Sequence, residues 1–441
     1  MEKSDGKPRN SLRAGISRTE ITPRQGTPLA GACWLRPAGE LCDRLFAKAL
    51  VLAQDTKSAA IITADVCGFD PRMVHRLQKY CRSQLGIQFL LCNASHTHSG
   101  PDTYNEFSDY TDRRALARRR QYQAVFEKKL RLLLTRANQK LQLVSVSHGQ
   151  GRAYFGINRR LKIGGEVLHM PNAKAYHDKT VSVFHFKRQS GKTLAVLFSY
   201  ACHPTTRYKG EISADYPGPA QELIEREIGG IAMFAQGAAG EIRPNVVDPR
   251  SRPKKFRQGT QKDVDRYGGE LGREVVRVLR HEMKPVDPRL QHARVTVRLP
   301  LESRWSNAHL RDYDGQPPTA SEDLRHNLVE KIINGLKRNG FPKVWPMEFM
   351  LLRLSEDHAI LATSHELCNS YVPLLQRMAR GTKLTIWGYT NDLRAYVPTR
   401  RQRLEGGYEG EWSFFYYGMP CPFAPSVEQV VVQAARKLLR L

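Results

Sequence analysis

The chain has 441 residues, of which 41% are hydrophobic and 25% charged, proportions that are ordinary for a globular protein. No apolar run reaches the roughly 18 residues that a membrane-spanning helix needs, which excludes a transmembrane segment. The eight cysteines are scattered without a CxxC pair, so we expect free thiols and no cysteine-only metal site.

From the N-terminus, we expect a polar tail over residues 1–13, then one continuous domain over 14–441. The tail lacks the apolar stretch of a secretory signal, which favours a cytoplasmic protein. Apolar runs of strand length recur at 49–53, 60–64, 88–91, 181–186, 194–200, 231–235, 359–363 and 383–387. Helical patterns are expected at 71–85, around 122–133, and at 219–227, 263–280, 321–337 and 427–439.

Strands that alternate with helices indicate an α/β fold, with a sheet covered by helices. Few helical residues separate the strands of 295–301 and 346–363, so we expect part of the sheet to be antiparallel or mixed. The segment 405–425 is rich in glycine, proline and aromatic residues, and we expect a long loop there, of a length that often covers a functional site.

Polar side chains follow several of these predicted strands. His96 and His98 come after the strand that ends near Leu91, and His203 follows 194–200. Glu366 comes just after 359–363, and Tyr396 lies beyond 383–387. Because ligands of open α/β sheets bind at the carboxyl ends of the strands, we expect these side chains to converge into a metal site there.

Two imidazoles, one carboxylate and a further oxygen ligand form a plausible zinc shell. The spacing alone is a weak signal, because alternate residues of any extended segment share a face. Taken singly, His203 fits the end of a strand, Glu366 fits a helix cap or a surface carboxylate, and Tyr396 fits a packing residue.

Four short motifs occur in order along the chain: AGISRTEITP at 14–23, ASHTHSGP at 94–101, CHP at 202–204 and GEIRPN at 240–245. Together they resemble the catalytic domain of the neutral, non-lysosomal ceramidases. The resemblance runs from about residue 14 to the end of the sequence, and SHTHSGP is its most specific part. The predicted helix at 427–439 corresponds to the close of that catalytic domain, so we expect no C-terminal β-sandwich domain of the kind that known ceramidases carry.

The resemblance implies one catalytic Zn²⁺ ion with four protein ligands: His96, His203, Glu366 and Tyr396. Tyr408 then corresponds to a second tyrosine, twelve residues further on, that hydrogen-bonds the carbonyl oxygen of the substrate. His98 corresponds to a histidine that orients the attacking water or moves a proton. Arg159 corresponds to an arginine that the family keeps near its site.

The sequence departs from the family at Arg243, which stands where the family pattern Gly-Asp-Val-Ser-Pro-Asn has an active-site serine. A guanidinium group is not a nucleophile and disfavours an apolar sphingoid chain beside it. It binds carboxylates and phosphates through paired hydrogen bonds. We therefore expect a small-molecule N-acyl substrate that is more polar than ceramide and carries an anionic group.

These observations lead to the prediction of a zinc-dependent amidohydrolase of lipid or sphingolipid metabolism, in which zinc-activated water attacks an N-acyl bond. The same site fits a zinc hydrolase of an ester or a glycosidic bond. A third reading is a catalytically silent domain that binds nucleic acid or an acidic polymer. The net charge of +26, with basic clusters at 118–120 and 254–257, fits that reading, although no nucleic-acid-binding motif is present.

Overall fold

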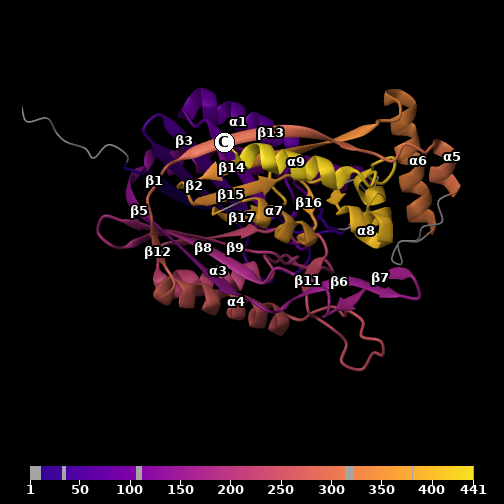
Figure 1. Ribbon diagram of the computed structural model, residues 1–441, viewed down its shortest axis with the longest axis horizontal. Coiled ribbons are helices and arrows are strands. Elements are labelled where there is room, and N and C mark those ends of the chain that lie inside the picture. Colours follow the sequence, from indigo (N-terminus) through magenta and orange to yellow (C-terminus); the bar gives the residue numbers. More distant parts are fainter. Residues whose placement is uncertain (1–10, 32–35, 106–111, 313–321, 380, 441) are drawn as a thin grey trace, which may run out of the picture.

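The computed structural model describes residues 11–31, 36–105, 112–312, 322–379 and 381–440, so most of the predicted polar tail lies outside it. Two mixed sheets pack against each other, and helices cover their outer faces (Figure 1). The predicted mixed α/β class is therefore confirmed. The structure adds that the second face of each large sheet is covered by the other sheet, not by helices.

The larger sheet has nine strands among the described residues, in the order β10-β9-β8-β5-β1-β2-β3-β4, with β12 paired to β5. The strands are β1 (Arg13–Glu20), β2 (Phe46–Gln54), β3 (Lys57–Ala64), β4 (Phe89–Ala94), β5 (Gln142–Arg152), β8 (Thr180–Arg188), β9 (Thr193–Tyr200), β10 (Ile231–Gln236) and β12 (Lys284–Val286). Strands β3 and β4 are parallel, as are β9 and β10. The sheet is curled, because the carboxyl ends of β4 and β10 meet: the Gln236 backbone N–H donates to the Asn93 side-chain oxygen, 2.7 Å away.

The remaining strands form three smaller sheets. The four-stranded sheet contains β13 (Gln291–Pro300), β14 (Val344–Arg353), β15 (His358–Thr363) and β17 (Lys383–Trp387). A three-stranded sheet contains β11 (Ile242–Pro244), β6 (Gly156–Ile163) and β7 (Glu166–Asn172). A two-stranded sheet contains β16 (Glu366–Leu367) and β18 (Tyr396–Val397). In the four-stranded sheet β13, β14 and β15 are antiparallel and β15 and β17 are parallel, which confirms the predicted mixture.

Apolar side chains fill the space between the two larger sheets. Leu52 and Ile61 of the nine-stranded sheet lie in one buried cluster with Leu352, Ile360 and Trp387 of the four-stranded sheet. On the outer faces lie the helices α1 (Pro71–Leu85), α2 (Arg113–Gln139), α3 (Pro217–Ile228), α4 (Gln261–His281), α7 (Val372–Met378) and α9 (Val427–Leu439). Helices α5 (Asn307–Asp312) and α6 (Glu322–Asn339) lie together at one end (Figure 1). Among the described residues, no helix has both the length and the apolarity to cross a membrane.

Local signals explain the helices that the sequence predicted best. Helix α1 begins where the Asp70 side chain accepts the Arg72 backbone N–H and Pro71 sets the first turn, and it ends at Gly86 in the left-handed conformation. The expected helices at 71–85 and 427–439 are confirmed residue for residue as α1 and α9.

The expected long loop at 405–425 was wrong in part. Helix α8 (Arg400–Glu405) enters this segment, and a π-helical turn, η2 (Tyr408–Trp412), and a 3-10 turn, η3 (Ser413–Tyr417), follow. Phe414 and Phe415 are buried against the four-stranded sheet, which holds the turns in place. A structured segment can present its tyrosines in fixed positions.

Candidate metal centre

Segments that follow the strand ends bring the four predicted metal ligands together. His96 comes two residues after β4, and His203 comes three residues after β9. Glu366 and Tyr396 begin β16 and β18, where they are directly paired neighbours in a parallel ladder. The four side chains are buried, at 4% exposure or less.

The potential ligand atoms lie close to one another. The Oε2 atom of Glu366 is 2.9 Å from His203 Nε2 and 3.4 Å from His96 Nε2. The Tyr396 hydroxyl is 3.2 Å from His203 Nε2. The ligand atoms of His96, His203 and Glu366 all lie within 4.8 Å of one another, a grouping that could hold a metal ion. Although burial opposes ionisation, the two imidazoles hold the pKa of Glu366 well below its usual range.

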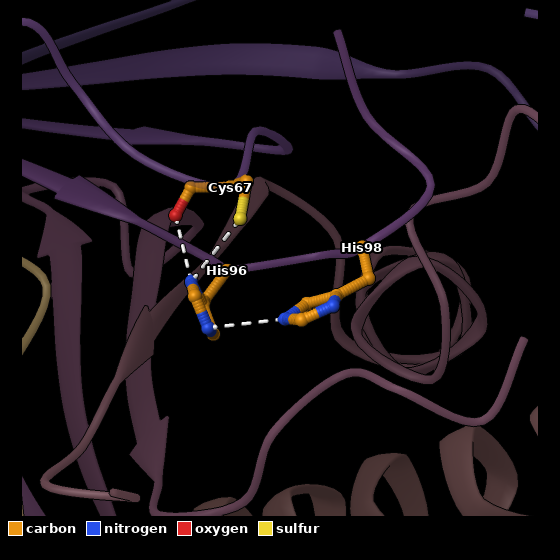
Figure 2. A group of neighbouring side chains, drawn as sticks. All are labelled: Cys67, His96 and His98. Carbon is orange, nitrogen blue, oxygen red and sulfur yellow. Dashed lines mark hydrogen bonds between the residues drawn. The ribbon is translucent and has the colours of Figure 1, made fainter. Parts of the chain in front are cut away.

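Backbone carbonyls fix the orientation of both imidazoles. His96 Nδ1 is 2.8 Å from the Cys67 carbonyl oxygen (Figure 2), and His203 Nδ1 lies 2.8 Å and 2.9 Å from the carbonyls of Ala239 and Ile242. These contacts at Nδ1 direct the Nε2 atom of each ring toward Glu366. Such outer hydrogen bonds are typical of histidines that bind metals.

The backbone around the centre is strained at residues other than glycine. His96, His365 and Tyr389 have φ angles of 66°, 69° and 55°, in the left-handed region. Each such residue costs about 1–3 kcal/mol and persists only where its surroundings fix it, commonly at functional sites. The Tyr389 ring lies against the His96 ring, with the centroids 4.4 Å apart.

His98 lies beside the predicted ligand His96. Its Nε2 atom is 3.2 Å from His96 Nε2 (Figure 2). A Cβ atom at Gly31 would come within 2.5 Å of the His98 ring, so this position requires glycine. Burial, with the neighbouring His96, lowers the pKa of His98 well below its usual range, which keeps the ring neutral.

Arg159, in β6, contacts the hydroxyl of the predicted ligand Tyr396. Its Nη2 atom is 3.0 Å from Tyr396 Oη and donates to the Gly240 carbonyl, 2.8 Å away. Its Nε atom donates to Glu409 Oε1 at 2.7 Å, and Arg160 Nη1 donates to Glu409 Oε2 at 2.9 Å. Although burial opposes the charged carboxylate, the two arginines lower the pKa of Glu409 to about 2. Glu409 thus fixes the cation beside Tyr396.

Tyr408, the predicted donor to the substrate carbonyl, is the first residue of η2. Its ring centroid is 5.0 Å from that of Tyr396, and the Arg159 guanidinium lies 5.2 Å from the Tyr408 centroid. Arg243, in β11, is directly opposite Ile157 of β6. Its Nη2 atom is 3.4 Å from the Thr205 carbonyl oxygen, and its guanidinium lies over the Phe256 ring.

Sequence reasoning missed several residues around the centre. Cys67 holds His96 through its carbonyl, and its sulfur is 3.4 Å from His96 Nδ1 (Figure 2). The Tyr417 hydroxyl donates to Glu366 Oε1, and Glu409 holds Arg159. The only signal for Tyr417 and Glu409 was their place in the aromatic segment 405–425.

Comparison with known proteins gives a family and a fold. The family model described as neutral/alkaline non-lysosomal ceramidase, N-terminal, matches residues 14–265. A crystal structure of neutral ceramidase from Pseudomonas aeruginosa matches with a TM-score of 0.72 and 19% identity, over 98% of this chain and 75% of that one. A structure of a ceramidase complexed with C2 matches with the same TM-score and coverage at 18% identity.

Proposed function

The chain belongs to the neutral/alkaline non-lysosomal ceramidase family, and from this premise we propose that it is a zinc-dependent hydrolase of an N-acyl amide bond. Family membership supports a hydrolase of the ceramidase type. The observation that carries the proposal is the buried group of His96, His203, Glu366 and Tyr396, whose donor atoms face one another.

The chemistry of this group fits zinc. Imidazole nitrogen and carboxylate oxygen are common zinc ligands, and the Nδ1 atoms of both histidines are already committed to backbone carbonyls. In our proposal His96, His203, Glu366 and Tyr396 hold the ion. Bound there, zinc would polarise a carbonyl oxygen and lower the pKa of water to about 7.

The remaining side chains supply proton transfer and charge stabilisation. His98 stays neutral, so its ring accepts a proton from the attacking water and returns it to the amine that leaves. Tyr408 donates its hydroxyl proton in a hydrogen bond to the carbonyl oxygen as that oxygen gains charge. Burial raises the pKa of the Tyr396 hydroxyl, and Arg159, which lies beside it, opposes this effect and so favours the anionic form as a ligand.

We propose that the substrate is more polar than ceramide. Arg243 stands where the family pattern has a serine, and a buried guanidinium disfavours an apolar sphingoid chain next to it.

Metal analysis and a substrate screen on one preparation test the proposal. We expect about one zinc ion per chain, and hydrolysis of N-acyl amides that stops when a chelator removes the metal. Amide and ester versions of the same acyl group should be compared, and preferential cleavage of the ester would replace the amide assignment. Absence of metal, together with nucleic-acid binding that collapses with added salt, would contradict the hydrolase proposal.

Replacement of Tyr408 by phenylalanine tests the carbonyl donor. We expect kcat to fall about 100-fold with little change in KM, since one such donor contributes about 3 kcal/mol in the transition state. Steady-state kinetics on the best amide substrate measures both constants. Tyr154→Phe removes an exposed hydroxyl and is the control. A rise in KM at unchanged kcat would mean that Tyr408 only binds the substrate.

A further inference from the structure

Arg243 is a buried arginine without an acidic partner among the described residues. Its exposure is 7%, and no carboxylate of the described chain forms an ion pair with it. Within the described part of the chain its Nε atom has no hydrogen-bond partner, and the contact of Nη2 with the Thr205 carbonyl is long, at 3.4 Å. Arg159 and Arg160, by contrast, share the carboxylate of Glu409.

An unpaired buried cation is costly. A guanidinium group that leaves water loses its hydration, and only an opposite charge or a full set of hydrogen bonds offsets that loss. Burial, together with the neighbouring cation of Arg159, lowers the pKa of Arg243 below its ordinary value. The Tyr208 side chain faces Arg243 and compensates this effect in part. The position is therefore one in which a bound anion would be stabilised.

A row of rings connects Arg243 with the candidate metal centre. The guanidinium lies 4.3 Å from the Phe256 centroid, and Phe256 is 5.6 Å from the ring of His169. The His169 ring is 6.2 Å from that of Tyr408, which lies 5.0 Å from Tyr396. His169 is exposed and Phe256 and Tyr408 are half-buried, so the middle of this row is accessible to solvent, while Arg243 and Tyr396 at its two ends are buried.

We propose that Arg243 binds a carboxylate of the substrate, so that the enzyme acts on N-acyl amides that carry a free carboxyl group, such as N-acyl amino acids. A guanidinium group binds a carboxylate through two parallel hydrogen bonds. The single uncompensated charge of Arg243 matches a monoanion, since Glu409, together with Glu405 beside Arg160, balances the charges of Arg159 and Arg160. This inference rests on the proposed amide hydrolysis.

The test compares two substrates that differ in charge, N-octanoylglycine and N-octanoylglycinamide. For Arg243→Ala we expect kcat/KM to fall about 10- to 100-fold more for N-octanoylglycine than for the amide, as a charged hydrogen bond predicts. Arg243→Lys should recover part of the loss. Arg250→Ala removes an exposed guanidinium from the same region and should leave the ratio of the two substrates unchanged. Equal losses on both substrates in Arg243→Ala would overturn the proposal.

Calorimetric binding of N-octanoylglycine separates this inference from the proposed function, because it needs no turnover. If neither compound is hydrolysed but binding weakens about 10-fold or more in Arg243→Ala, the hydrolase proposal fails and the carboxylate site stands. Equal binding by the wild type and Arg243→Ala overturns the site. Arg243→Met is a second variant, whose melting temperature is compared with that of the wild type. Removal of an uncompensated buried charge should raise the melting temperature. A lower melting temperature would show that the protein itself satisfies the charge and would overturn the proposal.

Discussion

Replacement of His203 by glutamine is expected to abolish zinc binding and to lower the hydrolysis rate at least about 1,000-fold, because metal activation of water and carbonyl supplies several kcal/mol. His203 is fully buried, with its Nε2 atom 2.9 Å from Glu366 and 3.2 Å from Tyr396. Two carbonyls contact its other nitrogen and so fix the orientation of the ring. Zinc content and kcat/KM measure the effect.

His148→Gln is the matched control. His148 is a buried histidine of β5 in the same nine-stranded sheet, and its Nε2 atom contacts the Ser182 hydroxyl at 3.0 Å. We expect this variant to keep its zinc and its activity. A His203→Gln protein with full metal content and full activity would contradict the assignment of the centre.

Much of the fold was predictable because its signals are local. The apolar run at 383–387 forms β17, and the residues at the two ends of α1 form its caps. Strands β6 and β7 were not predicted, since the polar run of 158–160 interrupts the apolar alternation of this hairpin. Their geometry depends on Glu409, which holds Arg159 and Arg160 from about 250 residues away.

The candidate site was predictable in its ligands but not in its supports. Polar residues after apolar strands, with four motifs in order, indicated His96, His203, Glu366 and Tyr396, and the structure places these side chains together. Tyr417, whose hydroxyl donates a hydrogen bond to Glu366, was not predictable. Tyr417 is 51 residues away in sequence, and nothing local distinguishes it from the other tyrosines of its segment.

Replacement of Glu409 by glutamine is expected to lower the free energy of unfolding by about 3–5 kcal/mol, because the buried Arg159 loses its carboxylate partner and Arg160 keeps only the longer contact with Glu405. Denaturant unfolding at neutral pH measures this difference. Activity should fall as well, since Glu409 positions the Arg159 guanidinium against the Tyr396 hydroxyl. Glu411→Gln, two residues further along η2, changes the same chemical group and serves as control.

The pH dependence of this loss distinguishes an ion pair from simple packing. The folded-state pKa of Glu409 is about 2, below its ordinary value of 4.5. The unfolded chain therefore binds the proton first as the pH falls, so the stabilisation is complete above pH 4.5 and is lost between pH 4.5 and 2. The difference in stability between the wild type and Glu409→Gln should shrink over that interval. A difference that stays constant down to pH 2 would mean that Glu409 stabilises the fold by its shape and neutral hydrogen bonds, and that the charge of Arg159 is balanced by another group.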